Sequence, residues 1–383
     1  MLEDFLDAKP LFYDEIDYSR MPRIYQRVQK YFKLPKVIHL IGTNGKGTTG
    51  RFLASALHSL GYQTGHYTSP HIIEFNERIW FNGKNVSMEI LEDTHQRLLS
   101  ILTPQEAEAL SYFEYTTFLA MLFFTKESDF IILEAGLGGE YDATAVFDND
   151  LTLVTPIDKD HEAFLGTTVD KIAKTKLNAV QKAAIIAKQK HAEVYDALVK
   201  IQEEKKFKSF FVEDLIDEYD RKNIQTIAKR ESLAIYLQEN LSLAIATLNY
   251  FHIPYKSQDF FNARLFGRLS AINKHILVDV GHNTLAAQAI VTALTEKKYI
   301  LVYNSYKDKN YKEILKILKP IIYEVQIITI DNNSRIARNN FLEETLSELD
   351  ITYSYFSNIK KDENYLVFGS FSVVEAFLKV YRG

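Results

Sequence analysis

A glycine-rich loop between an apolar run and a helical pattern constrains the fold of this chain most strongly. The loop lies within "HLIGTNGKGTTG" at residues 39–50. The run "KVIHLI" is typical of a buried strand, and the residues after the loop place five apolar side chains on one helical face: Phe52, Leu53, Ala56, Leu57 and Leu60. The pattern predicts that this helix ends at Gly61. Because free N–H groups and the helix dipole attract anions at such a turn, the loop predicts a phosphate site, with a tight structural turn as the alternative.

Short β-branched runs alternate with amphipathic stretches along the chain, which favours an α/β fold with largely parallel sheets. The expected strands are "VIHLIG", "FIILEA", "LTLVTP", "AAIIAK", "HILVDV", "YILVYN", "VQIITI" and "YLVFGS". The length of 383 residues predicts two domains. We expect a P-loop ATPase domain with a mostly parallel sheet over residues 1–262 and a smaller Rossmann-like α/β domain over residues 263–383, joined near Asp259–Arg264. The polar segment 189–239 is expected to form a solvated helix and one or two strands of the first domain.

Composition excludes several classes of protein. The chain has no cysteine, so disulfides, thiolate zinc sites and cysteine nucleophiles are excluded, and any metal ion must be held by oxygen or imidazole. The net charge of −5 gives no electrostatic footprint for nucleic acid. The longest apolar stretch, "TFLAMLFF", is too short to cross a bilayer, and the acidic start "MLEDFLDAKP" is unlike a signal peptide. We therefore expect a cytoplasmic monomer that binds neither nucleic acid nor membranes.

The loop departs from the strict P-loop pattern, because Gly47 separates Lys46 from Thr48. The spacing G-T-N-G-K-G-[ST] at Gly42–Thr48 is followed by the string T-S-P-H-x-x-x-[FY]-x-E-R-[IV] at Thr68–Ile79. Together they resemble the folylpolyglutamate synthase/dihydrofolate synthase family, a branch of the Mur ligase superfamily. The resemblance continues to the end of the chain and is weakest at 186–235.

The resemblance assigns roles to the loop. It implies that Lys46 contacts the β- and γ-phosphates of ATP and that the Thr48 hydroxyl ligates Mg²⁺. It also implies that backbone amides of the loop hold the phosphate oxygens: those of Gly42, Thr43, Asn44, Gly45 and Gly47. Without the family, Thr48 could be a helix N-cap, a role that is compatible with metal binding.

Further magnesium ligands follow two strands. "FIILEAGLGGEYDAT" places Glu134 at the C-terminal end of a buried strand, where open α/β sheets bind ligands; a carboxylate that caps the next loop is the alternative. The family motif E-x-G-L-G-G-x-x-D-A-T implies that Glu134 binds magnesium and that Asp142 lies at the pterin site. The motif D-H-x-x-[FY]-L-G implies a magnesium-ligating His161, although a lone histidine is more often structural. With Ser69, these residues imply two Mg²⁺ ions in oxygen-rich coordination.

The segment "IAKTKLNAV" aligns with the family string I-A-x-E-K-A-G-I. The lysine of that string is carbamylated in many Mur ligases and bridges to a metal ion. Lys176 takes its position, which implies a catalytic role. Thr175 replaces the usual glutamate, and Leu177-Asn178 replaces Ala-Gly. A lysine on the surface of a helix is the alternative.

The second domain contains "FGRLSAINKHILVDVGHNTLAAQAI", which resembles the family region G-R-x-E … D-G-A-H-N-P-x-[AG]. The resemblance implies that Arg268, Asp279, His282 and Asn283 reach the phosphates and the ribose, with His282 as a catalytic residue. An arginine at this place suits phosphoryl transfer, in which charge on the γ-phosphoryl group must be neutralised. Asn240 is expected to contact adenine. From the residues alone, Arg268 could form a surface ion pair and Asn283 could cap the helix that follows it.

The reaction that the resemblance implies is ATP-dependent amide formation. A substrate carboxylate attacks the γ-phosphate to give an acyl phosphate and ADP, and the amine of L-glutamate then displaces phosphate. The acceptor is dihydropteroate, a reduced folate or both, and it binds near Pro70, His71, Phe113 and Asp142. The alternatives are another Mur-superfamily amino-acid ligase and a P-loop nucleotide-binding protein without ligase activity.

Two departures from the family bear on the choice of acceptor. Glu74 and Glu140 stand where the family commonly has arginine. Loss of positive charge near the substrate pocket disfavours acceptors that carry polyanionic glutamate tails, because like charges repel. We therefore hypothesise that dihydropteroate is the better acceptor.

Overall fold

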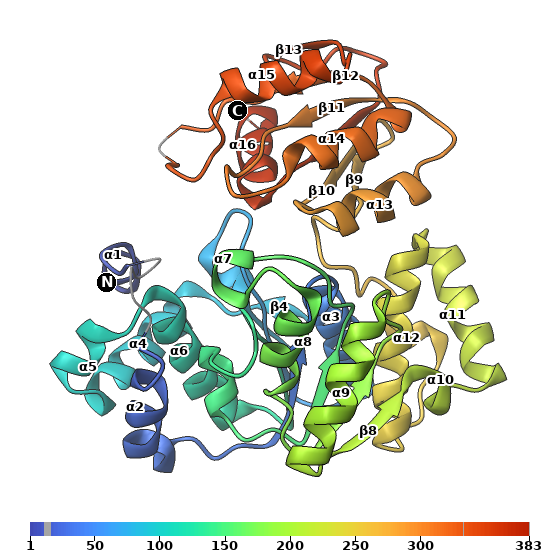
Figure 1. Ribbon diagram of the computed structural model, residues 1–383. Coiled ribbons are helices and arrows are strands. Elements are labelled where there is room, and N and C mark those ends of the chain that lie inside the picture. The colour runs from blue at the N-terminus through green and yellow to red at the C-terminus, as the bar shows by residue number, and fades with distance from the viewer. Residues whose placement is uncertain (11–16, 332, 383) are drawn as a thin grey trace. The chain divides into compact units, whose positions relative to one another are not determined.

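The computed structural model describes residues 1–10, 17–331 and 333–382 (Figure 1). The chain divides into two compact units. Unit 1 consists of Met1–Leu233 and Leu237–Ala263, and unit 2 consists of Ala234–Tyr236 and Arg264–Gly383. Within the described part of the chain, no helix is both long enough and apolar enough to span a bilayer.

Unit 1 is built on an eight-stranded sheet. Its strands lie in the order β4 (Lys84–Asn85), β3 (Ile79–Phe81), β2 (Thr64–Tyr67), β5 (Phe130–Glu134), β1 (Lys36–Ile41), β6 (Leu151–Val154), β7 (Ala183–Ile186) and β8 (Lys208–Phe211). The strands from β2 to β8 in this order are parallel, whereas β3 pairs antiparallel with both of its neighbours. Because parallel strands end at one edge of a sheet, the loops after β1, β5, β6 and β7 share that edge.

Helices cover both faces of this sheet. Those of unit 1 are α1 (Leu2–Asp7), α2 (Arg20–Val28), α3 (Lys46–Ser59), α4 (Met88–Ile101), α5 (Pro104–Ala109), α6 (Tyr112–Glu127), α7 (Glu162–Leu165), α8 (Val169–Leu177), α9 (Ala192–Lys205), α10 (Val212–Leu215), α11 (Glu218–Glu231) and α12 (Ile235–Tyr250). The first two residues of α12 belong to the segment Ala234–Tyr236, which is assigned to unit 2. Short 3-10 helices are η1 (Gln29–Tyr31), η2 (Phe75–Arg78), η3 (Ala143–Val146) and η4 (Ser257–Phe260). Gly50 of α3 lies against His66, and Gly65 lies against Phe124 of α6. Since neighbours along a strand point to opposite faces, α3 and α6 pack on opposite sides of β2.

Burial on both faces explains the apolar runs of the central strands. Every residue of β5, β6 and β7 is buried, and only Lys36 of β1 is exposed. Parallel strands between two helical layers therefore read as continuous apolar segments. Glu134 is the one charged residue at the end of such a run.

Unit 2 contains a six-stranded sheet. Its strands lie in the order β13 (Tyr353–Tyr355), β12 (Ile322–Ile327), β11 (Tyr299–Tyr303), β14 (Tyr365–Phe368), β10 (Ile276–Asp279) and β9 (Ser270–Asn273). β9 pairs antiparallel with β10, and the other described pairs are parallel. The helices of the unit are α13 (Thr284–Ala293), α14 (Tyr311–Leu318), α15 (Asn339–Glu348) and α16 (Phe371–Arg382), with the 3-10 helix η5 (Lys319–Ile321).

The α/β class and its eight predicted strands are confirmed. Each predicted run overlaps one strand: β1, β5, β6, β7, β10, β11, β12 and β14 in turn, with β1 beginning one residue and β12 three residues before its run. The helix after the glycine-rich loop ends as predicted. Gly61 has a φ of 94°, its N–H donates to His58 O at 2.9 Å, and Tyr62 N–H donates to Leu57 O at 3.0 Å. This pair of bonds is a Schellman motif. The polar segment 189–239 forms α9 and β8, as predicted, and also α10, α11 and the start of α12.

Candidate active site

The glycine-rich loop connects β1 to α3. Gly45 is the N-cap of α3 with a φ of 92°, and Gly42 has a φ of 138°. A side chain at Gly42 would collide with Thr155, and one at Gly45 would collide with Asn240. Both positions therefore need glycine, for the backbone conformation and for the close approach of a neighbour.

The backbone amides of the loop fall into two groups. The N–H groups of Thr43 and Asn44 donate to the carbonyl oxygen of Pro156, at 2.9 and 3.4 Å. The N–H groups from Gly45 to Thr48 open α3, where a helix leaves its first four amides without an intrahelical acceptor. These amides and the positive end of the helix dipole form the part of the loop suited to an anion.

Thr48 and Asn240 both lie at this loop. Thr48 is 3% exposed and lies in the first turn of α3, so the alternative that Thr48 is the N-cap is wrong. Asn240 comes from α12, is buried, and packs against Gly45. The side chain that is predicted to contact adenine, Asn240, thus already contacts the nucleotide loop.

Two lysines converge on the carbonyl oxygen of Gly42. Lys46 Nζ donates to it at 3.1 Å and Lys176 Nζ at 2.9 Å. Lys176 is 4% exposed on α8, so the alternative of a surface lysine is wrong. Burial, together with the nearby charge of Lys46, lowers the pKa of Lys176 to about 7. Gly139 packs against the backbone of Lys176, where an added Cβ would lie 2.6 Å from its carbonyl oxygen.

Glu134 ends β5, next to β1 in the sheet. It is 5% exposed and accepts hydrogen bonds from the Thr68 hydroxyl and, at 3.3 Å, from Ser69 N–H. No basic side chain pairs with it among the described residues. A buried carboxylate with this surrounding fits a divalent cation, because an unpaired buried charge is costly.

His161 occupies the first position before α7 and has a left-handed backbone conformation with a φ of 51°. Its Nε2 lies 4.0 Å from Asp160 Oδ2, and its side chain is 35% exposed. Nowhere in residues 1–10, 17–331 and 333–382 do three His, Asp or Glu side chains form a group that could hold a metal ion. A site at Glu134 would therefore need hydroxyl, water or substrate oxygens to complete it.

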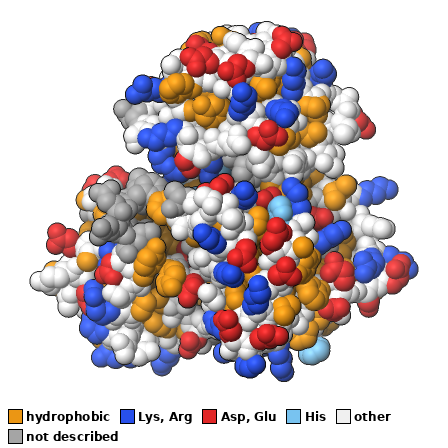
Figure 2. Space-filling model, in the orientation of Figure 1, with side chains coloured by type: hydrophobic (Ala, Val, Ile, Leu, Met, Phe, Trp, Pro, Cys, Tyr) orange, Lys and Arg blue, Asp and Glu red, His pale blue; other side chains and the backbone are white. Residues whose placement is uncertain are grey.

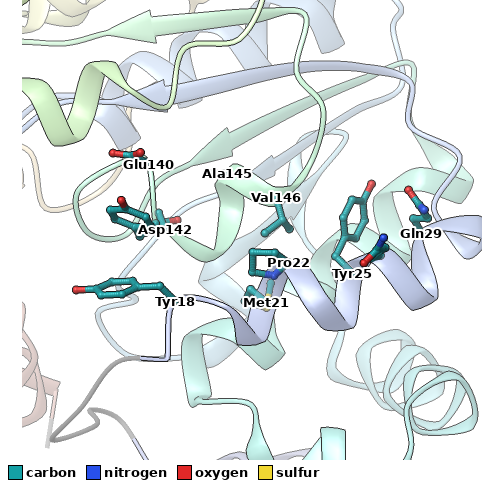
Figure 3. Close-up of a pocket in the computed structure, with 11 residues that line it drawn as sticks. Tyr18, Met21, Pro22, Tyr25, Gln29, Glu140, Asp142, Ala145 and Val146 are labelled. Carbon is teal, nitrogen blue, oxygen red and sulfur yellow. The ribbon is translucent and has the colours of Figure 1, made fainter. Parts of the chain in front are cut away.

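A cavity of about 260 Å³ lies between α2 and the loop that follows β5 (Figure 3). It is lined by Tyr18, Met21, Pro22, Tyr25, Gln26, Gln29, Glu140, Tyr141, Asp142, Ala145 and Val146. At its rim the rings of Tyr18 and Tyr141 lie 4.6 Å apart and are both more than half exposed. The mixture of aromatic rings and a few polar groups is typical of a site for a flat organic ligand.

Asp142 is buried at the wall of this cavity. Its Oδ1 accepts from Thr144 N–H at 2.9 Å and from the Thr144 hydroxyl at 2.6 Å, and its Oδ2 accepts from Leu137 N–H at 2.8 Å. Burial raises the pKa of the Asp142 carboxyl, and these hydrogen bonds oppose the shift. Asp142 thus orders the loop that follows β5 as well as facing the cavity.

Pro70, His71 and Phe113, predicted near the acceptor, occupy neighbouring parts of unit 1. The Ser69–Pro70 peptide bond is cis. Burial, with the charge of Arg78 beside it, lowers the pKa of His71 to about 4. Arg78 Nε donates to His71 Nδ1 at 2.8 Å, so the neutral ring carries its proton on Nε2. Phe113 lies against Gly136 in the loop after β5.

Asp279 lies at the end of β10 in unit 2 and is 4% exposed. Its carboxylate accepts from Gly281 N–H at 2.7 Å, from Leu269 N–H at 2.8 Å and from the Tyr236 hydroxyl at 3.2 Å. Burial raises the pKa of Asp279, and the charge of Arg268 opposes the shift. The carboxylate therefore already orders the chain around the predicted nucleotide contacts.

The other predicted residues of unit 2 surround this carboxylate. The guanidinium of Arg268 lies over the ring of Phe371, 5.2 Å from its centroid, and its Nη1 donates to Gly267 O at 3.1 Å. His282 Nδ1 lies 3.2 Å from Val280 O. Asn283 caps α13, since its Oδ1 accepts from Ala286 N–H at 2.9 Å. The structural role considered for Asn283 is thus confirmed.

Sequence reasoning missed several residues that shape the site. Pro156 and Asp158 hold the nucleotide loop from the end of β6, and Tyr18 and Tyr25 form a wall of the cavity. Arg78 sets the tautomer of His71. Only Arg78 lay in a recognised motif; the others come together through packing and carried no local signal.

Comparison with known proteins gives consistent results. No protein-family model matches the chain. A dihydrofolate synthase/folylpolyglutamate synthase of Buchnera aphidicola is 30% identical over 370 residues, which cover 88% of this chain and 86% of the relative. The crystal structure of Helicobacter pylori folylpolyglutamate synthetase is 38% identical with a TM-score of 0.80, over 100% of this chain and 98% of that chain. The structure of a bifunctional folylpolyglutamate synthase/dihydrofolate synthase from Yersinia pestis, complexed with AMPPNP and Mn ion, has the same fold, with a TM-score of 0.83 and 22% identity. The match covers 100% of this chain and 97% of that chain.

Proposed function

We propose that this chain, which belongs to the dihydrofolate synthase/folylpolyglutamate synthase family, is an ATP-dependent ligase that joins a pteroyl or folyl carboxylate to L-glutamate. The reaction passes through an acyl phosphate and releases ADP and phosphate. One observation carries the proposal: Lys46 and the buried Lys176 converge on the nucleotide loop one strand away from the buried carboxylate of Glu134.

The loop provides the charge clamp for phosphoryl transfer. The backbone N–H groups of residues 45–48 lie at the start of α3 and can donate to phosphate oxygens. The Lys46 ammonium now bonds the carbonyl oxygens of Gly42 and Thr43 and can exchange these bonds for a phosphate. The acceptor carboxylate is already a nucleophile, so the chain needs to neutralise repulsion and align the reactants rather than supply a covalent intermediate.

Magnesium is the proposed metal cofactor, and two ions are expected. Thr48, Ser69, Glu134 and His161 would hold them, and Mg²⁺ would supply charge neutralisation for the phosphates of ATP. The Yersinia pestis structure of the same fold holds AMPPNP and Mn ion, which supports the pairing of nucleotide and divalent metal. The buried, unpaired carboxylate of Glu134 is the feature of this chain that fits such a cation best.

Lys176 is proposed to act as a carbamate. An amine with a pKa of about 7 is largely neutral at pH 8, and only the neutral amine adds CO₂. Addition of CO₂ to the neutral amine forms the N–C bond, releases one proton, and would leave a carbamate anion beside the cation of Lys46, where opposite charges attract. In unit 2 we assign Arg268 and Asp279 to the nucleotide and His282 to catalysis.

The cavity beside Asp142 is the proposed acceptor site, and Pro70, His71 and Phe113, which do not line it, are proposed further contacts of the acceptor. Glu140 lines it, and Asn178 Nδ2 holds the Glu140 carboxylate at 2.9 Å. A fixed negative charge at the rim supports dihydropteroate over folates with polyanionic tails. Glu74 is exposed and does not line the cavity, so only one of the two departures from the family supports this preference.

Formation of ADP that depends on both glutamate and acceptor tests the proposal. A ligase acting on a different acceptor would show no turnover with dihydropteroate or a reduced folate, and a nucleotide-binding protein without ligase activity would hydrolyse ATP regardless of either substrate. Faster turnover on a folate polyglutamate than on dihydropteroate would overturn the acceptor preference.

We also propose a cytoplasmic monomer that binds small molecules and no nucleic acid. The net charge of −5 supports the last point, and on the face in Figure 2 basic side chains lie among acidic ones. Light scattering after gel filtration tests the monomer, and a filter-binding assay with DNA and RNA tests the absence of nucleic-acid binding.

A further inference from the structure

Thr43 ties the nucleotide loop to the loop that follows β6. Its hydroxyl donates to Asp158 O at 2.9 Å and accepts from Asp158 N–H at 3.0 Å. The same loop accepts two amides of the nucleotide loop at Pro156 O. The side chain of Thr43 is therefore held by the main chain of Asp158 in both directions.

The carboxylate of Asp158 extends this connection to the loop after β7. His191 Nε2 lies 3.0 Å from Asp158 Oδ1, and Lys190 Nζ lies 3.9 Å from Oδ2. The side chains of Asp158 and His191 are only 12% and 25% exposed. Gln189 strengthens the junction, since its Oε1 accepts from Ile157 N–H at 2.9 Å. Three strand-end loops are thus joined through one residue: the main chain of Asp158 bonds Thr43, and its carboxylate contacts His191 and Lys190.

The position of His191 in the chain is unusual for its type. It is the N-cap of α9, where Ser, Thr, Asp or Asn would bond the first helical amides, and its side chain makes no such bond. The imidazole is directed to Asp158 instead. The N-cap of α9 therefore lacks the side-chain hydrogen bond that helix starts usually have. Such departures from local sequence preference are expected at residues that have a functional role.

We propose that His191 is a positioning residue for the nucleotide. Through Asp158 and Thr43 it holds Gly42–Thr48 in the shape that presents its amides and Lys46 to phosphate. The inference rests on the proposed function, because it concerns the same nucleotide loop. If only a fraction of molecules holds that shape, the apparent affinity for nucleotide falls by that fraction, whereas turnover of the bound complex is preserved.

The test measures KM for ATP, kcat, and the Kd of Mg-ADP in the full chain. His191→Ala should raise KM for ATP and the Kd of Mg-ADP about tenfold, as for outer residues that orient a binding group, and should leave kcat within about twofold. His191→Gln, whose amide N–H can still donate to Asp158, should recover most of the affinity. Glu193→Ala, an exposed residue in the same turn of α9, is the control and should change neither quantity.

A double variant tests the route. If His191 acts through Thr43, Thr43→Val should weaken nucleotide binding, and adding His191→Ala should weaken it little more. Independent, additive losses would overturn the proposed route. An unchanged KM for ATP in His191→Ala, or a fall in kcat alone, would overturn the positioning role. The wild-type chain is measured first: absence of ADP formation and of Mg-ADP binding would refute the proposed function itself. If His191→Ala does not fold, His191→Leu, which has no donor for Asp158, replaces it in the comparisons with His191→Gln and Thr43→Val.

Discussion

Lys46 Nζ and Lys176 Nζ donate to the same atom, the carbonyl oxygen of Gly42, at 3.1 and 2.9 Å. Lys46 reaches it from the start of α3 and Lys176 from α8, so the two ammonium groups lie close together. Of these two lysines, Lys176 is buried and Lys46 is partly exposed. The charge of Lys176 is therefore the one that burial and the neighbouring cation disfavour, and Lys46 remains the cation available to phosphate.

Replacing Lys46 with Ala should lower ligase turnover at least about 100-fold, because the developing charge on the phosphates loses its lysine. The fold should be retained, since Lys46 bonds only loop carbonyls of Gly42 and Thr43. Steady-state ADP release and the melting temperature check both parts. Retained turnover in this variant would refute the assignment of the phosphate loop.

Replacing Lys176 with Met should stabilise the fold at pH 6. The pKa of Lys176 is about 7 in the folded chain and 10.5 ordinarily, so the unfolded chain binds more protons between these values. Wild-type stability should rise with pH through that window. We expect Lys176→Met to raise the free energy of unfolding by roughly 2 kcal/mol at pH 6, after subtracting the lost bond to Gly42, with a gap that shrinks toward pH 10. Urea unfolding at several pH values measures this; a gap independent of pH would contradict it.

Replacing Glu134 with Gln should weaken Mn²⁺ binding at least about tenfold in the presence of ADP. The amide keeps the shape of the side chain and an acceptor for Thr68 and Ser69, but it removes the negative charge that a hard cation requires. Electron paramagnetic resonance of free Mn²⁺ gives the affinity. Asp148→Asn, an exposed carboxylate, is the matched control; equal effects of the two substitutions would show that Glu134 is no metal ligand.

Replacing Tyr18 with Ala should raise KM for dihydropteroate about 3- to 10-fold, because the acceptor loses an aromatic wall of the cavity. KM for ATP should not change. Tyr31→Ala removes an exposed ring that does not line the cavity and serves as the control. If Tyr18→Ala alters KM for ATP instead, the cavity is not the acceptor site.

Replacing Asn283 with Ala should lower the free energy of unfolding by about 1 kcal/mol, because α13 loses its cap. Asn310 caps α14 in the same way, and Asn310→Ala should cost a similar amount. Comparing the ligase activities of the two variants separates capping from substrate contact. Equal activities mean that Asn283 serves the helix alone, whereas a selective loss in Asn283→Ala means that it also serves the site.

Much of the fold was predictable because burial on two faces leaves a simple pattern. β1, β5, β6 and β7 are continuous apolar runs, and each was expected. β2 was missed although all of it is buried, because "TGHY" is no apolar run. Gly65 and His66 suit that strand only because α6 and α3 pack closely on its two faces. Such a requirement depends on distant partners and cannot be read locally.

In the candidate site, too, the residues within local sequence patterns were predicted, and those that depend on distant partners were missed. Spacing within one short segment revealed the nucleotide loop, and a strand ending in a carboxylate revealed Glu134. The cavity was only half anticipated: Asp142 was predicted from its motif, whereas Tyr18 and Tyr25 reach the cavity because α2 packs against η3. The function of His191 depends on Asp158, a partner in another loop, which no pattern around residue 191 indicates.

The carbonyl of Pro156, which accepts the amides of Thr43 and Asn44, has an entropic consequence for nucleotide affinity. Fixing the backbone of one residue costs about 1–2 kcal/mol. Because Thr43 and Asn44 are ordered when the domain folds, this entropy cost lowers the free energy of unfolding and does not weaken the binding of ATP. A binding loop built this way can release its product and meet the next nucleotide without having to order its backbone again.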